Sequence, residues 1–377
     1  MLLTSELSVN YTSRKTSRKT NAIINLSALV SNYKHIAKLA PQSKTIAVIK
    51  ANAYGHGAIK VAEALSQHAP ALAVAFIDEA LILRDAGINL PILILEGALD
   101  PEDVAIALKQ NFWLMLHNTE QVDWLVNLSK KQALSYSGKL WLKVDTGMNR
   151  LGIMPNDVDS ILAKLSNIQL QSLVLCTHFS NANELNNPKT LAQIKQFESI
   201  NKNYLCKKSL ANSAGIINWP ESHGDYNRLG LALYGASPVP TINLPIKLDP
   251  VMTLQSTVIA LRKLTVGESV GYGELWQAKR PSLIATIAIG YADGYPRNAK
   301  AGTPVFIKGR LVPIVGRVSM DMTTIDVTDI EQVKLGDLVE LWGDNLSVEV
   351  VAKHMGSINY ELLTRVSARV PKQYISR

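Results

Sequence analysis

The chain has 377 residues, of which 47% are hydrophobic and 19% are charged, a composition that suits a large globular domain followed by a smaller one. No apolar run approaches the roughly 18 residues of a membrane span, and Glu6 and Asn10 interrupt the first apolar stretch. We therefore expect no membrane insertion, no signal peptide and a cytoplasmic location. The net charge of +8 does not indicate a nucleic-acid partner, because four of the positive charges lie in a repeated Ser-Arg-Lys-Thr at residues 13–20. We predict that residues 1–21 form a disordered basic tail.

Short apolar strands alternate with helical patterns through the first 240 residues. A possible strand at Ala22–Asn25 and a helix at Leu26–Leu39 come first. Eight strands then follow, at Thr45–Lys50, Ala71–Phe76, Pro91–Leu95, Trp113–Leu116, Leu140–Asp145, Gln169–Thr177, Ser209–Asn212 and Tyr226–Leu229. This alternation predicts an α/β fold with a TIM-type (β/α)8 barrel over residues 22–240, whose functional groups follow the carboxyl ends of the strands.

Prolines at positions 238, 240 and 245 mark a linker, after which the pattern changes. Alternating segments separated by glycine turns, and one helix near Val348–His354, predict a mainly β domain over residues 241–377. The segments are Met252–Leu264, Leu283–Ile289, Val312–Val318 and Thr323–Val327. The early strand at Ala22–Asn25 is a candidate partner for this second sheet.

The sequence contains few residues with the spacing of a metal or disulfide site. Cys176 and Cys206 are too few for a disulfide framework and lack zinc-ligand spacing, so we expect reduced thiols. No two histidines have the helical spacing of a metal site, and we predict no metal.

Lys50 lies where the first barrel strand is followed by Ala-Asn-Ala-Tyr-Gly-His-Gly. A lysine at a strand end is most often a solvent-exposed cap. A partly buried lysine amine is, however, also the nucleophile that bonds covalently to a carbonyl group, and Gly55 and Gly57 allow the backbone to pass close to a ligand. The residues by themselves leave both interpretations open.

Loops after three later strands offer groups that bind anions. Ser213 follows the seventh strand, and the amides of Gly230 and Leu231 follow the eighth, where barrels commonly bind phosphate. After the fifth strand, Arg150 offers a planar fork that matches a carboxylate.

The run Ile49–Gly57 resembles the pyridoxal-phosphate attachment motif of bacterial alanine racemases. Five further runs resemble motifs of the same family in the same order: Lys143–Gly152, Val270–Glu274, Ile289–Arg297, Gly316–Asp321 and Ile358–Glu361. The resemblance spans residues 22–369. It implies an enzyme that uses pyridoxal 5'-phosphate to interconvert L-alanine and D-alanine, and that supplies D-alanine for peptidoglycan synthesis.

The resemblance also implies a role for each motif residue. Lys50 carries the cofactor and is the base on the D-alanine face, and Tyr272 is the base on the L-alanine face. The residues implied to bind the cofactor are Tyr54, His178, Asn212, Ser213, Arg228, Gly230, Leu231 and Tyr360, and those implied to bind substrate are Arg150, Met320 and Tyr291. Arg228 is implied to face the pyridine nitrogen, which keeps the ring a weak electron sink and favours racemisation.

Two other properties follow from the family. It implies a homodimer in which the second domain of one subunit closes the barrel of the other. Some members carry a carbamylated lysine at the position of Lys143, which orients the arginine that corresponds to Arg150. The sequence leaves open whether Lys143 is modified, how strictly alanine is preferred and whether the role is biosynthetic or catabolic.

Two alternatives to an alanine racemase remain. The first is a related enzyme with a barrel and a β domain, either a decarboxylase or a racemase that accepts a broader range of amino acids. Decarboxylases of this architecture place an acid at the pyridine nitrogen, so Arg228 argues against them. The second is a non-catalytic pyridoxal-phosphate carrier, which leaves residues 241–377 without a role.

Overall fold

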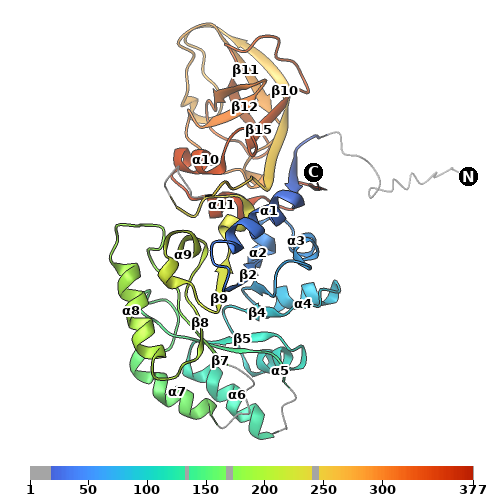
Figure 1. The fold of residues 1–377 in the computed structure, drawn as a ribbon. Coiled ribbons are helices and arrows are strands. Elements are labelled where there is room, and N and C mark those ends of the chain that lie inside the picture. Colours follow the sequence, from blue (N-terminus) through green and yellow to red (C-terminus); the bar gives the residue numbers. More distant parts are fainter. Residues whose placement is uncertain (1–17, 132–135, 167–172, 240–245, 377) are drawn as a thin grey trace, which may run out of the picture.

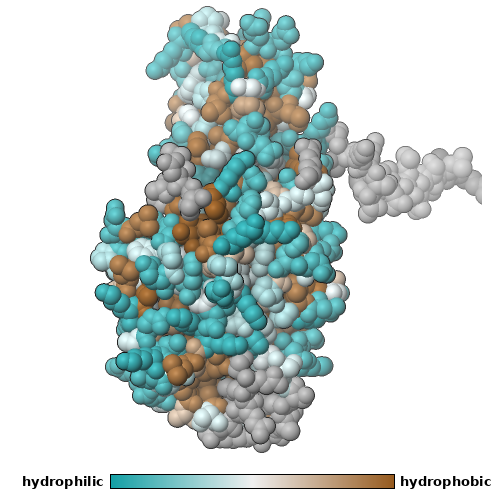
Figure 2. Space-filling model, in the orientation of Figure 1, coloured by the Kyte–Doolittle hydropathy of each residue, from teal (hydrophilic) through white to brown (hydrophobic). Residues whose placement is uncertain are grey.

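The computed structural model describes residues 18–131, 136–166, 173–239 and 246–376, and Figure 1 shows that they form two stacked parts. The larger, lower part is a barrel, and the smaller, upper part is built mainly of strands. Hydrophobic surface gathers at the waist between the two parts on the face shown in Figure 2. Within the described ranges, no helix has the length and apolar character needed to cross a membrane.

Eight parallel strands form the barrel, and they confirm the predicted (β/α)8 class. Strands β2 to β8 pair in chain order, and β9 pairs with β2. A hydrogen bond of 2.9 Å from the amide of Arg228 to the carbonyl of Ala211 joins β9 to the chain that follows β8. The strands are β2 (Lys44–Val48), β3 (Leu72–Val74), β4 (Ile92–Ile94), β5 (Trp113–Leu116), β6 (Leu140–Lys143), β7 (Leu173–Cys176), β8 (Lys207–Ser209) and β9 (Tyr226–Leu229).

Each predicted barrel strand overlaps an observed one, and several predicted boundaries are wrong, two of them near site residues. Strand β2 ends at Val48, so Lys50 lies beyond the strand rather than at its end. Strand β8 ends at Ser209, and the chain then leads directly into the next helix. Part of the predicted strand Gln169–Thr177 lies outside the described residues.

Helices surround the barrel because each presents one apolar stripe to the strands. In α5, Asp100 accepts a hydrogen bond of 2.9 Å from the amide of Asp103, Pro101 occupies the first turn, and the buried stripe includes Val104 and Leu108. The helices of this part are α1 (Leu26–Ala37), α2 (Lys50–Tyr54), α3 (Ala58–Leu65), α4 (Ile77–Asp85), α5 (Pro101–Lys109), α6 (Thr119–Lys131), α7 (Val158–Leu165), α8 (Lys189–Asn201) and α9 (Ser213–Asn218).

Aromatic rings fill the amino-terminal end of the barrel. Trp113, Trp141 and Tyr226 lie near the starts of β5, β6 and β9, and their ring centroids are 5.2–6.2 Å apart. Such contacts stabilise the core beyond the burial of apolar area. The amino-terminal end of the barrel is thus closed by packed rings.

The second domain is a mainly β unit, as predicted. Its main sheet has the strand order β13-β12-β15-β10-β1-β16, and β11 links β10 to β14. The strands are β1 (Asn21–Asn25), β10 (Met252–Leu264), β11 (Ser282–Ile287), β12 (Pro304–Ile307), β13 (Arg310–Pro313), β14 (Thr323–Asp326), β15 (Leu338–Trp342) and β16 (Lys372–Ile375), and the helices are α10 (Val348–Met355) and α11 (Asn359–Arg365). The predicted strand Val312–Val318 is wrong beyond Pro313, because the chain turns at Gly316 with a φ of 69°.

Strand β1 precedes the barrel in the sequence but belongs to the second sheet. It pairs antiparallel with β10 and parallel with β16, which confirms the predicted pairing of Ala22–Asn25. The predicted barrel boundary at residue 22 therefore includes a strand of the other domain. The prediction of a disordered tail is wrong for residues 18–21, because Thr20 is buried and donates to the carbonyl of Ala288 at 2.7 Å. Residues 1–17 lie outside the described residues.

Helix α11 connects the two parts by lying against the barrel mouth (Figure 1). Its backbone approaches Gly55 so closely that a Cβ on Gly55 would lie 2.2 Å from the carbonyl oxygen of Leu363. Gly55 also has a φ of 82°, which residues with a side chain rarely adopt. Glycine at this position thus lets a helix of the second domain cover the end of the barrel.

Candidate active site

A cavity of about 500 Å³ opens at the carboxyl end of the barrel, where loops from several strands meet α11. The structure brings the predicted barrel residues and one residue of α11 together in its wall. They are Lys50, Tyr54, Arg150, His178, Asn212, Ser213, Arg228, Gly230, Leu231 and Tyr360.

The segment between Lys50 and Tyr54 is a single turn of left-handed helix. Ala51, Asn52, Ala53 and Tyr54 have φ values of 50–54°. Each such residue with a side chain costs roughly 1–2 kcal/mol relative to right-handed geometry. Alanine and tyrosine disfavour this conformation, so the sequence contains no local signal for the turn, and strain of this kind is concentrated at functional sites.

The half-buried side chain of Glu79 and the buried side chain of His56 hold the left-handed turn in place. The carboxylate of Glu79 accepts hydrogen bonds from the amide of Ala51 at 2.6 Å and from the amide of Ala75 at 2.8 Å. Nδ1 of His56 lies 3.0 Å from the carbonyl oxygen of Ala53 and 2.9 Å from that of Tyr54, so it carries a proton and donates to both. Burial lowers the pKa of His56 to about 4, which keeps its ring neutral.

Glu96 lies beside Lys50, with its Oε1 atom 3.6 Å from Nζ. It follows β4, and its backbone carbonyl is 2.9 Å from Nε2 of His117, which follows β5. Sequence reasoning missed Glu96 and His117. Their position directly after an apolar barrel strand is the signal that could have identified them.

Arg228 is a buried cation whose hydrogen-bond acceptors are mainly carbonyl oxygens. Its Nη1 donates to the carbonyl and hydroxyl oxygens of Ser209 at 3.0 and 2.6 Å, and its Nη2 donates to the carbonyls of Thr177 and Leu210 at 2.7 and 3.1 Å. Burial lowers the pKa of Arg228. The side chain is thereby fixed in one orientation within the cavity wall.

His178 lies next to this guanidinium, with Nδ1 3.5 Å from Nη2 of Arg228. The pKa of His178 is held well below its usual value, mainly by burial and secondly by the positive charge of Arg228. The imidazole is therefore neutral. Since Nδ1 faces a donor, the proton lies on Nε2.

The loop that carries Arg150 is organised by Asp145. One carboxylate oxygen of Asp145 accepts hydrogen bonds from the amides of Gly147, Met148 and Asn149 at 2.8–3.1 Å. Val144 pairs with Ile153 across the base of the loop, so that Arg150 is presented to the cavity.

Lys143 is the last residue of β6, and its side chain is buried in the cavity wall. Among the described side chains, no carboxylate lies within 4.0 Å of its amine. Burial lowers the pKa of Lys143, and the nearby charges of Arg228 and Arg150 act in the same direction. These surroundings make the amine of Lys143 lose its proton more readily than an exposed lysine does.

An anion cradle lies in the wall of the same cavity as Lys50. The amides of Gly230 and Ala232 both donate to the hydroxyl oxygen of Ser213, at 2.9 and 3.4 Å, and Asn212 caps the helix that begins at Ser213. A Cβ on Gly230 would lie 2.8 Å from the phenol oxygen of Tyr54. A phenol, a hydroxyl and backbone amides thus surround a space that any side chain at position 230 would fill, which fits a phosphate group.

Three predicted site residues lie elsewhere. Tyr272 and Tyr291 begin the short 3-10 helices η4 (Tyr272–Glu274) and η5 (Tyr291–Asp293), and Met320 lies in a neighbouring loop. Tyr272 is 70% exposed and Met320 is 53% exposed. None of the three is among the described residues that line the barrel cavity of the same chain.

Comparison with known proteins agrees with the two-part architecture. Residues 24–238 match the model of the alanine racemase N-terminal domain, and residues 251–374 match that of the alanine racemase C-terminal domain. The chain belongs to the alanine racemase family. The predicted family and enzyme class are therefore confirmed.

Relatives and solved structures of this family align over nearly the whole chain. The alanine racemase of Alteromonas mediterranea is 45% identical over 94% of this chain and 98% of its own length. The catabolic alanine racemase of Pseudomonas putida is 42% identical over 95% of this chain and 99% of its own length.

Two solved structures share the fold of the chain. That of the biosynthetic alanine racemase of Pseudomonas aeruginosa is 41% identical, with a TM-score of 0.89 over 94% of this chain and 99% of its own. That of the Bartonella henselae alanine racemase, which contains covalently bound pyridoxal phosphate, is 31% identical, with a TM-score of 0.87 over 94% of this chain and 99% of its own.

Proposed function

We propose that this chain interconverts L-alanine and D-alanine with pyridoxal 5'-phosphate attached to Lys50. The observation that carries the proposal is a single cavity whose wall contains both a lysine amine and an anion cradle. Tyr54, Ser213 and the amide of Gly230 would hold the phosphate, and Arg228 would face the ring nitrogen. Burial raises the pKa of Tyr54, so its phenol keeps the proton that it donates to an anion.

Bound pyridoxal phosphate supplies an electron-withdrawing ring that makes the Cα–H bond of alanine more acidic. Arg150 binds the alanine carboxylate with its planar fork. Lys50 removes or returns the Cα proton on the D-alanine face, and Tyr272 does so on the L-alanine face. Two bases are required because the configuration at Cα inverts.

Arg228 supports racemisation over decarboxylation. An arginine in a protein does not give up its proton, so it donates to a facing nitrogen and cannot accept from it. The acceptors that hold Arg228 are supplied by the chain itself, so the side chain keeps this role independently of the substrate.

The proposal is tested by treating the purified holoenzyme with borohydride and mapping the labelled peptide. We expect the cofactor on Lys50 and racemisation of L-alanine in preference to L-serine and L-lysine. A label on another lysine would contradict the attachment site. Turnover of lysine equal to that of alanine would instead favour a broader racemase.

The proposal extends to a two-fold homodimer in which Tyr272, Tyr291 and Met320 complete the barrel cavity of the partner subunit. Lys50 and the cradle lie inside one chain, whereas these three residues are exposed on its second domain. Leu275 and Met322 are exposed on the same loops. Exposed apolar side chains gathered in this way mark an interaction surface, and a two-fold dimer makes two identical shared sites.

Subunit mixing tests the shared site. Lys50→Ala and Tyr272→Phe proteins are dissociated, mixed and reassociated. If sites form between subunits, one site of each mixed dimer is intact, and random pairing restores about a quarter of wild-type activity. If each site forms within one chain, every site keeps one defect, and mixing restores nothing.

The proposed biological role is the supply of D-alanine for peptidoglycan in the cytoplasm. Relatives include an enzyme named catabolic and one named biosynthetic. Deletion of the gene distinguishes the two roles: a biosynthetic enzyme leaves cells that need added D-alanine, and a catabolic enzyme leaves cells that fail to grow on alanine.

A further inference from the structure

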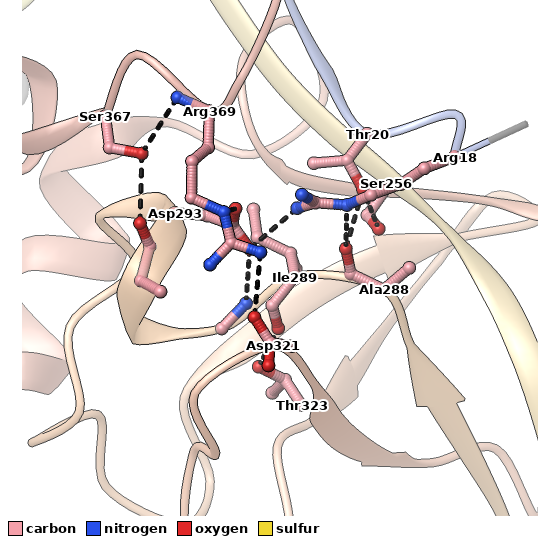
Figure 3. A network of polar contacts seen from close by, with 12 residues as sticks. Arg18, Thr20, Ser256, Ala288, Ile289, Asp293, Asp321, Thr323, Ser367 and Arg369 are labelled. Atoms are coloured by element: carbon pink, nitrogen blue, oxygen red, sulfur yellow. Dashed lines mark hydrogen bonds and ion pairs between the residues drawn. The ribbon is translucent and has the colours of Figure 1, made fainter. Parts of the chain in front are cut away.

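Two arginines from opposite ends of the chain converge on one buried carboxylate in the second domain (Figure 3). The side chain of Asp293 is fully buried. Arg18, which precedes β1, places Nη2 2.6 Å from Oδ2 of Asp293, and Arg369, which precedes β16, places Nε 3.6 Å from Oδ1. The segment before β1 and the segment before β16 thus meet at this point.

Asp293 closes the turn that begins with Tyr291. Its Oδ2 atom accepts a hydrogen bond of 3.0 Å from the amide of Gly290. The amides of Tyr291 and Ala292 then donate to the carbonyls of Ser319 and Met320, both at 3.0 Å. The loop of Tyr291 and the loop of Met320 are therefore joined through their backbones, and a shift of the Asp293 carboxylate displaces both.

The segment around Arg369 also makes polar contacts with the same two loops. Nη2 of Arg369 lies 2.8 Å from Oδ1 of Asp321, the residue after Met320. Ser367 donates from its amide to the carbonyl of Asp293 and from its hydroxyl to the carbonyl of Ala292, both at 3.0 Å. Arg369 thus links the turn of Tyr291 to the loop of Met320 with one side chain.

Arg18 is itself fixed to the sheet. Its Nε donates to the carbonyl of Ala288 at 3.0 Å, and Thr20, two residues on, donates to the same carbonyl at 2.7 Å. The hydroxyl of Thr20 also lies 2.8 Å from that of Ser256 in β10. The guanidinium that reaches Asp293 is therefore held by a strand of the sheet.

Polar contacts hold the exposed parts of these loops. Ile289, Tyr295 and Val318 anchor the flanking chain in the core. The side chains of Tyr291 and Met320 are exposed in the single chain and lie outside that core. A buried carboxylate that loses its cationic partner is left uncompensated and moves or becomes protonated. Either change loosens the turn that the carboxylate closes.

We propose that Arg18 and Arg369 are positioning residues for racemisation. By pairing with Asp293 they hold Tyr291 and Met320 where these side chains meet the alanine bound in the partner's barrel. The inference rests on the proposed shared site. Under this proposal, the segments before β1 and before β16 help to shape the substrate pocket.

The test uses dimers of two differently tagged chains, one of which carries Lys50→Ala. In the shared arrangement, the only working site combines the intact barrel with the second domain of the Lys50→Ala chain. Arg18→Gln in the Lys50→Ala chain should lower kcat/KM for L-alanine about tenfold, mainly through KM, since misplaced contacts weaken substrate positioning. Arg18→Gln in the other chain should leave kcat/KM unchanged, because its second domain closes the inactive barrel.

Equal losses at both placements would show a general structural defect and overturn the positioning role, as would no loss at either placement. A loss only when Arg18→Gln is in the chain with the intact barrel would overturn the shared site and keep the positioning role within one chain. The mixing of Lys50→Ala with Tyr272→Phe tests the shared site separately.

Lys19→Gln is the matched control, because it removes the same charge from an exposed neighbour of Arg18 and should change nothing. If the Arg18→Gln chain does not fold, Arg369→Gln replaces it in the same two placements. Arg18→Lys should restore only part of the loss, since one ammonium cannot bond both Ala288 and Asp293 with the geometry of a guanidinium.

Discussion

The barrel mouth and the loops of the second domain contribute to the proposed site in opposite ways. At the mouth, Arg228 and Lys143 are buried, and Arg228 is fixed by oxygens of its own chain. On the loops, Tyr272 and Met320 are exposed, and the neighbouring backbone is held by ion pairs. The difference teaches that one half of the site is preorganised by folding, whereas the other half is exposed in the single chain and, in the proposed dimer, would be covered by the partner's barrel.

The two regions also differ in where strain and charge are placed. The mouth contains a left-handed turn beside Lys50, held by Glu79 and His56. The loops are held instead by Asp293, a buried carboxylate between two arginines. Changes at the mouth should therefore affect cofactor attachment and stability, and changes on the loops should affect substrate positioning and catalysis.

The largest expected effect is at the mouth. Lys50→Ala should lower racemisation in both directions by about 10³-fold or more and abolish borohydride labelling, because it removes both the attachment point and one base. Racemisation assays and peptide mapping measure the two losses. Lys60→Ala, an exposed lysine of α3 paired with Glu63, is the control and should keep full activity.

A second effect at the mouth concerns stability. Arg228→Gln should lower the free energy of unfolding by about 3–5 kcal/mol, because the buried oxygens around the guanidinium lose their donors. Denaturant unfolding of the apoprotein measures this change. Arg280→Gln removes an exposed arginine paired with Asp329 and should leave the unfolding midpoint unchanged. Equal stabilities would mean that the buried contacts of Arg228 contribute nothing.

On the loops, Tyr272→Phe should lower racemisation by about 100-fold, the loss typical for one general acid–base group. Cofactor labelling of Lys50 and the unfolding midpoint should stay at wild-type values, because Tyr272 is outside the cavity of its own chain. A loss of labelling would contradict the division of labour between the two regions.

The barrel mouth should also make the free energy of unfolding depend on pH through His56. Burial lowers the pKa of His56 to about 4 in the folded protein, while the unfolded value is about 6.5. The unfolded state therefore binds more protons between these values. The contribution to stability is full above pH 6.5 and is lost as pH falls toward 4, with about 2 kcal/mol lost at pH 5.

His56→Asn should make stability less dependent on pH in this window, because its amide can donate near the position of Nδ1 but does not titrate. His56→Leu removes the donor and should destabilise the protein at every pH, because two buried carbonyls lose their partner. Urea unfolding at pH 7 and pH 5 measures both variants. A His56→Asn protein with the wild-type pH dependence would exclude His56 as the source.

The smallest effect concerns substrate size. Tyr360 lines the mouth of the cavity from α11. Tyr360→Ala should raise kcat/KM for L-serine relative to L-alanine by less than about tenfold, since one added hydroxyl is weakly discriminated. Competition between the two substrates measures the ratio, and an unchanged ratio would show that Tyr360 does not limit substrate size.

Local residue patterns were enough to predict the order of barrel strands and the change to a mainly β domain. Hydrophobic periodicity specifies strands and helices one at a time, and alternating strands and helices close into a barrel in few ways. Ser213 and Gly230 follow strands seven and eight, and this place by itself predicts an anion site at one face of the barrel. The family resemblance was needed to predict Lys50, His178 and Arg228 in the cavity.

Long-range contacts decided the remaining features. The conformational preferences of its own residues oppose the left-handed turn after Lys50. The turn forms because Glu79, 28 residues further along the chain, accepts a hydrogen bond from its backbone, and because His56 donates to two of its carbonyls. Glu96 reaches Lys50 only because β4 ends on the same face of the barrel as β2.

The pairing of Arg18 and Arg369 with Asp293 is the clearest case of contacts that a local sequence pattern could not predict. Arg18 belongs to a polar, charged repeat that predicts a mobile tail, and it is fixed because β1 pairs with β10 and β16, more than 200 residues away. A local pattern cannot encode a partner at that separation, because the contact depends on where the whole sheet places Asp293. Tertiary structure alone brings Arg18, Arg369 and Asp293 together beneath the loops of Tyr291 and Met320.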